Sequence, residues 1–189
     1  ETCSAIKKDF YRIGITAYSS LVKNEQKEFH SHFSGLNEAI VAEEQRKFLK
    51  KLMDLEMFSD LRKWLESAEG MEKKILIYQQ KKVPIDEIFY IDKDRKKFNE
   101  IGYEWQREVY LYVCDEIAKT KGVPEEDIQK EFLKANFTGK LMSLARMVEE
   151  TFGEGSFREL GNLGTDDNAA HNTLESLKKF RLRKIKKKT

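Results

Sequence analysis

Apolar residues recur along most of this chain at the three- and four-residue steps of an α-helix. The clearest case is 101–118, where one stripe includes Val109 and Ile117 and a second includes Tyr110 and Cys114. A helix that is apolar on two sides packs against neighbours on two sides. The segment is therefore predicted to be the central helix of a bundle, with Cys114 as a small core residue rather than a nucleophile.

Similar periodicity predicts further helices, and the sequence offers few residues that would interrupt them, with 10 Gly and 2 Pro in 189 residues. In the predicted helix over 36–68, Ser59-Asp60 marks an expected interruption and Gly70 the expected end. In the predicted helix over 124–152, Asn136 to Gly139 marks an expected kink. The predicted helices cover residues 4–23, 36–68, 124–152 and from about 168 onward.

Residues 75–91 are open to two interpretations. Ile75 to Tyr78 and Ile88 to Ile91 are β-branched and aromatic, which is typical of two short strands joined by a turn. The alternative is a helix to about Lys82 and a new helix beginning at Pro84. The neighbouring segments are strong helix formers, so the helical interpretation is preferred and a small β-hairpin at 75–91 is the alternative.

The expected fold is all-α, a single bundle of about five to seven helices with a basic C-terminal extension. Four of the 10 glycines lie in 153–168, which is predicted to be a loop. The domain boundaries follow from that loop. Residues 1–152 form the helical bundle, 153–168 the Gly-rich loop, and 169–189 a C-terminal helix and basic tail, with Thr165 or Asp166 as the helix cap.

The charge of the chain is unevenly distributed. The whole sequence carries a net charge of +2, yet 8 of the last 12 residues are Lys or Arg and none is acidic. The remainder then holds 27 basic residues against 33 acidic ones, so it is mildly acidic. The basic residues of the tail are Lys178, Lys179, Arg181, Arg183, Lys184, Lys186, Lys187 and Lys188.

Such a basic segment can neutralise phosphates and release counterions, which gives salt-sensitive binding without sequence preference. We therefore expect a non-enzymatic helical subunit or accessory factor of a nucleic-acid-containing assembly, with the basic tail contacting phosphates. An acidic protein partner is the alternative, in which case the chain is an adaptor or scaffold. A third possibility is a module on an anionic membrane surface, although Leu182 and Ile185 offer little apolar area for insertion.

Catalytic and metal-binding patterns do not emerge from the sequence. His30 and His32 cannot share a face of a helix, and no Glu-x-x-His pair occurs. Gly153 to Ser156 lacks the lysine of a phosphate-binding loop. The aromatic group Tyr103, Trp105, Tyr110 and Tyr112 is assigned to the core. We therefore expect no enzyme activity, no cofactor, no metal and no small-molecule substrate, and an intracellular location, cytoplasmic or nuclear.

Overall fold

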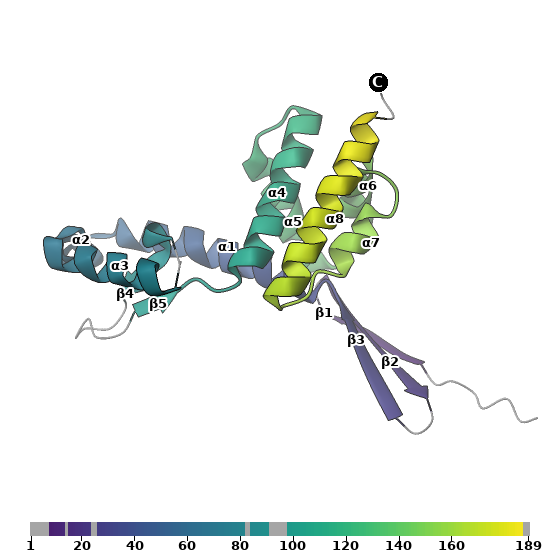
Figure 1. Ribbon diagram of the computed structural model, residues 1–189, viewed down its shortest axis with the longest axis horizontal. Coiled ribbons are helices and arrows are strands. Elements are labelled where there is room, and N and C mark those ends of the chain that lie inside the picture. The colour runs from purple at the N-terminus through teal and green to yellow at the C-terminus, as the bar shows by residue number, and fades with distance from the viewer. Residues whose placement is uncertain (1–7, 14, 24–25, 82–83, 91–97, 187–189) are drawn as a thin grey trace, which may run out of the picture. The chain divides into compact units, whose positions relative to one another are not determined.

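The computed structural model describes residues 8–13, 15–23, 26–81, 84–90 and 98–186 (Figure 1). Across these ranges the chain forms eight α-helices, a three-stranded sheet and a two-stranded sheet. The predicted all-α class is therefore confirmed in its main feature, a helical bundle with a minor hairpin. The chain divides into two compact units, which the sequence analysis did not separate. Unit 1 comprises 1–40 and 105–189, and unit 2 comprises 41–104.

Unit 1 contains most of the helices and the larger hydrophobic core. Helix α1 begins in this unit and continues into unit 2. The elements are β1 (Lys8–Ile13), β2 (Thr16–Lys23), β3 (Gln26–His32), α1 (Ser34–Met53), α4 (Glu104–Lys121), α5 (Glu125–Thr138), α6 (Met142–Phe152), α7 (Ser156–Gly161) and α8 (Asp167–Lys186).

The predicted helix over 4–23 is wrong where the structure describes it. Strands β1 and β2 pair antiparallel, with Tyr11 opposite Tyr18, and β3 adds a third strand with Ser19 opposite His30. The segment is rich in aromatic and β-branched residues, which fit a pleated sheet better than a helix. Residues 4–7 of the predicted helix lie outside the described residues.

Helix α4 is the central helix of unit 1, as predicted. Most of both apolar stripes is buried, including Val109 and Ile117 on one and Cys114 on the other. Burial of each large aliphatic side chain contributes about 1.5–3 kcal/mol. Tyr110 is buried as well and packs edge-on against Phe132 of α5.

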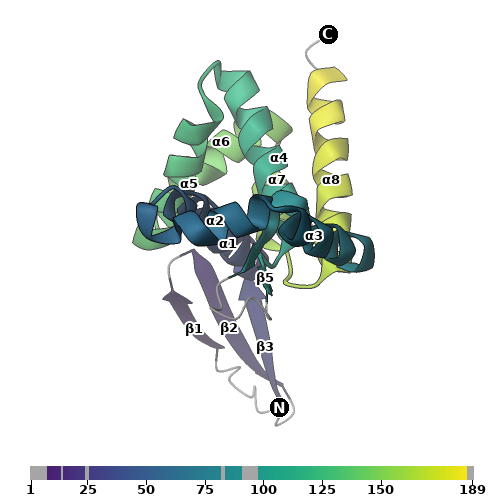
Figure 2. The same ribbon diagram turned by 90° about the vertical axis from the view of Figure 1, so that its left-hand side faces the viewer.

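Helices α5 and α6 replace the single kinked helix expected over 124–152. Helix α5 ends at Thr138, and Gly139 follows it with a φ of 67°, a left-handed conformation that closes many helices. The kink expected at 136–139 is therefore a complete break. Figure 2 shows α5 folded back beside α4.

The glycine-rich segment 153–168 is more ordered than a loop. It contains α7, and Leu160 and Leu163 from it are fully buried in the core of unit 1. Asp166 is the cap of the next helix, because its Oδ1 accepts a hydrogen bond of 2.8 Å from the backbone N–H of Ala169. Helix α8 then runs on to Lys186, so the described part of the basic tail is helical.

The start of α1 is joined to this segment through backbone atoms. The N–H of Phe33 donates to the carbonyl of Gly161 at 2.8 Å, and the N–H of Gly35 donates to the carbonyl of Leu163 at 3.0 Å. A Cβ built on Gly35 would lie 2.6 Å from the carbonyl oxygen of Leu163 and closer still to that of Gly164. Only glycine permits this approach. We call this contact the backbone junction of unit 1.

Unit 2 is smaller and contains helices that the sequence analysis joined differently. An interruption at Ser59-Asp60 is confirmed, since α2 begins at Ser59. Gly70 does not end the block, because it is buried inside α3. The break lies at Ser67, whose hydroxyl accepts a hydrogen bond from the N–H of Gly70 at 3.2 Å. The elements are the rest of α1, η1 (Glu56–Phe58), α2 (Ser59–Glu66), α3 (Ala68–Lys81), η2 (Ile85–Glu87), β4 (Ile88–Tyr90) and β5 (Phe98–Glu100).

The preferred interpretation of 75–91 is confirmed for its first half. Residues 75–81 are helical, and a single helical turn, η2, follows Pro84. A hairpin does exist, but its strands are Ile88–Tyr90 and Phe98–Glu100, with Phe89 opposite Asn99. The partner of the second predicted strand therefore lies after it in the sequence rather than before it.

Replacing Gly35 by alanine tests the backbone junction. Gly35→Ala is expected to lower the free energy of unfolding by at least about 2 kcal/mol, because the added methyl group forces apart backbone atoms that cannot yield as a side chain can. The measurement is urea unfolding followed by circular dichroism. The control is Gly102→Ala, where a Cβ meets nothing within 4 Å and a change within about 0.5 kcal/mol is expected. Equal effects of the two variants would contradict the prediction.

Candidate nucleic-acid interface

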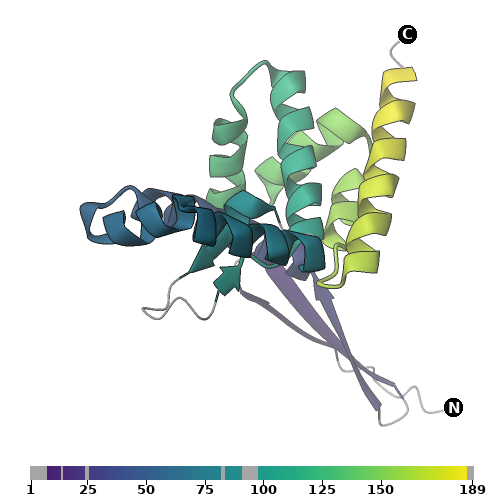
Figure 3. The same ribbon diagram turned by 60° about the vertical axis from the view of Figure 1, so that its left-hand side comes forward.

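The predicted phosphate-contacting residues are distributed over helix α8 rather than along an extended tail. Helix α8 runs beside α4, as Figure 3 shows with α8 in yellow and α4 in teal. Its first half is anchored in the core of unit 1 by Ala170, Leu174 and Leu177. Lys187 and Lys188 lie outside the described residues. The other six predicted residues fall into four groups, according to what surrounds each side chain.

Arg181 is committed to the fold of unit 1. Its Nε donates to Glu116 Oε2 of α4 at 2.7 Å, and one terminal nitrogen donates to the Thr151 carbonyl at 2.9 Å. The other terminal nitrogen donates to Thr120 Oγ1 at 3.0 Å. The side chains of Arg181 and Glu116 are only 19% and 17% exposed, so this ion pair is partly shielded from water. Arg181 thus ties α8 to α4 and to the end of α6.

Lys178 is paired with an acidic residue of its own helix. Its Nζ lies 3.0 Å from Glu175 Oε1, one helical turn away. The hydrogen bond from this ammonium group lowers the pKa of the Glu175 carboxyl, and its positive charge acts in the same direction. Pairs of this kind at the surface are weak, yet they neutralise the local charge. Lys178 is therefore less available to a phosphate than its unpaired neighbours.

Lys179, Arg183 and Lys186 form an exposed basic strip along one face of α8. They follow one another at i, i+4 and i+7, so their side chains emerge on the same side of the helix. All three are exposed. Within the described part of the chain, none of them lies within ion-pair distance of an acidic side chain. The charge of the basic strip is thus directed to the solvent.

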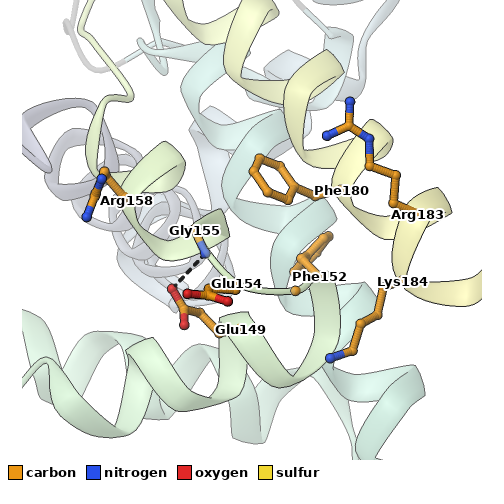
Figure 4. Close-up of a pocket in the computed structure, with 9 residues that line it drawn as sticks. Glu149, Phe152, Glu154, Gly155, Arg158, Phe180, Arg183 and Lys184 are labelled. Carbon is orange, nitrogen blue, oxygen red and sulfur yellow. Dashed lines mark hydrogen bonds between the residues drawn. The ribbon is translucent and has the colours of Figure 1, made fainter. Parts of the chain in front are cut away.

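A cavity of about 630 Å³ lies beside the basic strip, where α8 passes the end of α6 and the start of α7 (Figure 4). Arg183 belongs to both features, and Lys184 lines the cavity only. We call this cavity the α8 pocket. Its walls are Glu149, Phe152, Gly153, Glu154, Gly155, Arg158, Phe180, Arg183 and Lys184.

The glycines beneath α8 keep the α8 pocket open. Gly153 and Gly155 have φ values of 109° and 86°, which non-glycine residues rarely adopt. A Cβ on Gly155 would lie 3.8 Å from two ring carbons of Phe180, and one on Gly153 would lie 3.8 Å from the Lys184 stem. Glu149 supports the turn, since its Oε1 accepts a hydrogen bond of 3.2 Å from the Gly155 N–H.

Sequence reasoning identified Arg183 and Lys184 but missed the other walls of the α8 pocket. Glu149, Glu154 and Arg158 are ordinary charged residues when the sequence is considered alone. The one available signal was the pair Gly153 and Gly155 immediately after a helical segment, which was interpreted only as part of a loop. That the turn lies against α8 follows only from tertiary packing.

Other functional patterns in the chain receive little support. No group of three or more potential metal ligands occurs among the residues that the structure describes. In the aromatic group assigned to the core, Tyr110 is buried, whereas Tyr103 and Trp105 are 41% and 39% exposed. Trp105 packs edge-on against His171 of α8. No helix within the described ranges is long and apolar enough to cross a bilayer.

Comparisons of this chain with protein-family models, with curated proteins and with solved structures found no match.

The contrast between Arg181 and Arg183 can be tested directly. Arg181→Met is expected to lower the free energy of unfolding by about 2 kcal/mol, because Glu116 and the Thr151 carbonyl lose a charged donor. Arg183→Met removes an equal charge from the exposed face of the same helix, and a change within about 0.5 kcal/mol is expected. Urea unfolding of both variants measures the difference, and identical midpoints would show that the three contacts of Arg181 contribute nothing.

Proposed function

We propose that this chain is a non-enzymatic helical subunit of a nucleic-acid-containing assembly, and that the exposed basic strip of α8 contacts phosphates. The observation that carries the proposal is the set Lys179, Arg183 and Lys186, exposed on one face of a helix and, within the described residues, not ion-paired with an acidic side chain. Lys and Arg in such a position bind the phosphate backbone without reading bases. Phosphates repeat along a strand, and so do the charges along α8.

The anchoring of α8 supports this role. A flexible basic tail loses conformational freedom when it binds, and that loss weakens the complex. In α8 the strip is already ordered by the core residues Leu174 and Leu177 and by the contacts of Arg181. The mildly acidic remainder of the chain disfavours coating by nucleic acid over the whole surface, so binding is expected to centre on α8. The proposal places the chain inside the cell, in the cytoplasm or the nucleus.

Neutralising the strip tests the proposal. The triple variant Lys179→Gln, Arg183→Gln and Lys186→Gln is expected to reduce the slope of log affinity against log salt by about 2 to 3, since each phosphate contact contributes close to one unit. The measurement is fluorescence anisotropy of labelled single- and double-stranded oligonucleotides between about 50 and about 200 mM salt.

A matched control removes the same charge from another part of the surface of unit 1. The control triple variant carries Lys130→Gln, Lys134→Gln and Lys140→Gln, three residues that are also exposed. Its salt slope is expected to equal that of the unmodified chain. If the two triple variants weaken binding equally, net charge rather than the strip is responsible. If the unmodified chain binds no oligonucleotide at low salt, the proposed function is wrong.

A protein adaptor is the second candidate, and a feature of unit 2 favours it. Met71, Ile75 and Tyr78 follow one another at i, i+4 and i+7 on α3 and are 37%, 42% and 44% exposed. Leu76 beside them is 53% exposed. An apolar stripe on a surface helix is a common docking element for another protein.

Charge substitutions on α3 separate the two candidates. Ile75→Lys with Leu76→Lys is expected to leave urea unfolding within about 0.5 kcal/mol, because both side chains are exposed. If the chain is an adaptor, a protein retained by the unmodified chain in affinity capture is lost from this variant. If it is a nucleic-acid-binding subunit only, oligonucleotide affinity and protein capture are both unchanged.

A further inference from the structure

We propose that the α8 pocket receives one base of a single-stranded nucleic acid, while the flanking phosphates contact the basic side chains that line it. The inference rests on the proposed function and makes it more specific, because it defines which nucleic acid is preferred. A single strand can turn a base into a cavity at small cost, whereas a base in a duplex must first lose its pairing and stacking. The pocket would therefore favour single strands over duplexes.

The charges inside the α8 pocket indicate which part of a nucleotide enters it. Glu149 and Glu154 both line the cavity, so a phosphate placed beside them would meet two carboxylates, whereas Arg158, Arg183 and Lys184 line other parts of it. Like charges at short range disfavour that placement. A neutral planar group is not repelled, and a base can donate N–H groups to a carboxylate. The part of the cavity beside Glu149 and Glu154 is thus better matched to a base than to a phosphate.

Phe180 provides an aromatic surface for such a base. Its ring faces the cavity between Gly155 and Phe152 (Figure 4). The side chain is only partly buried against the core of unit 1, so part of the ring is accessible. A Cβ on Gly155 would contact the ring at 3.8 Å, so the glycine leaves this part of the ring uncovered. Stacking of bases on exposed aromatic rings is the usual way in which proteins bind single strands without sequence preference.

Basic side chains lie on both sides of this aromatic surface. In Figure 4, Arg158 of α7 lies on one side of Phe180, and Arg183 and Lys184 of α8 lie on the other. A strand that crosses the pocket would meet a cation, the aromatic ring and further cations in turn. That order matches phosphate, base and phosphate along a single strand. Arg183 links the pocket to the basic strip, so the two surfaces can bind one strand together.

The experiment compares two single strands that differ only in their bases. One is an oligonucleotide of about 12 residues, and the other has the same length but contains abasic sites throughout, so it keeps the phosphates and lacks the rings. The full chain is expected to bind the normal strand about tenfold more tightly than the abasic strand by anisotropy. Phe180→Leu, which stays apolar but lacks a flat ring, is expected to remove this difference and to leave duplex affinity unchanged.

A second variant guards against a folding defect in Phe180→Leu. Arg158 is exposed and lies on α7, away from the basic strip. Arg158→Gln is expected to weaken binding of the normal single strand severalfold without changing duplex affinity. Its control is Lys140→Gln, because Lys140 lines a second cavity, of about 250 Å³, that has no aromatic wall. That control is expected to change neither affinity.

The outcomes separate the inference from the proposed function. If normal and abasic strands bind equally, with the salt slope predicted for the strip, the base-binding inference is overturned and the proposed function stands. If no oligonucleotide binds, both are wrong. An oligoglutamate peptide of similar charge serves as a further probe. If it binds as tightly as the normal strand and does so through Arg158, the pocket is specific for an acidic peptide, which also overturns the inference.

Discussion

The backbone junction between residues 33–35 and 161–164 holds unit 1 together, because that unit is assembled from two separate stretches of the chain. Its two hydrogen bonds satisfy N–H groups at the start of α1, which a helix cannot satisfy internally. Phe33 adopts a φ of 62°, unusual for a bulky residue, and its ring packs against Phe157 of α7. Such a conformation persists only where the surroundings enforce it. The placement of α7 and of the segment leading into α8 therefore depends on this contact.

Helix α8 shows how one run of basic residues can serve two purposes. Arg181 faces α4 and contributes to the fold, whereas Arg183, two positions later, faces the solvent. The angular step of a helix makes this division, because residues two apart lie on nearly opposite sides. From the sequence alone, Arg181 and Arg183 have the same predicted role, because both are basic residues of the same charged run. The contacts of Arg181 hold α8 against α4, and they thereby hold the exposed strip in place. The strip and the α8 pocket share Arg183.

The sequence was sufficient for features that depend on local pattern and insufficient for those that depend on distant contacts. Both buried stripes of α4 and the cap at Asp166 followed from spacing and residue type. The segment 4–23 failed because its apolar residues fit two periodicities, and pairing with β3 decided the outcome. The walls of the α8 pocket come from α6, α7 and α8 and from the turn between α6 and α7. The type and spacing of the charged residues do not indicate that these elements lie side by side. Only the two glycines beneath α8 gave a local sign of it.

The order of unit 1 along the chain has a consequence for synthesis. Residues 41–104 make the contacts of unit 2 among themselves and can begin to do so as soon as that stretch has left the ribosome. The start of α1 leaves the ribosome earlier, yet its partners Gly161 and Leu163 are made more than a hundred residues later. Leu36 and Ile40, which are fully buried in the finished protein, must wait for α4 and α8. Among the described helices, the start of α1 is thus synthesised early and covered late.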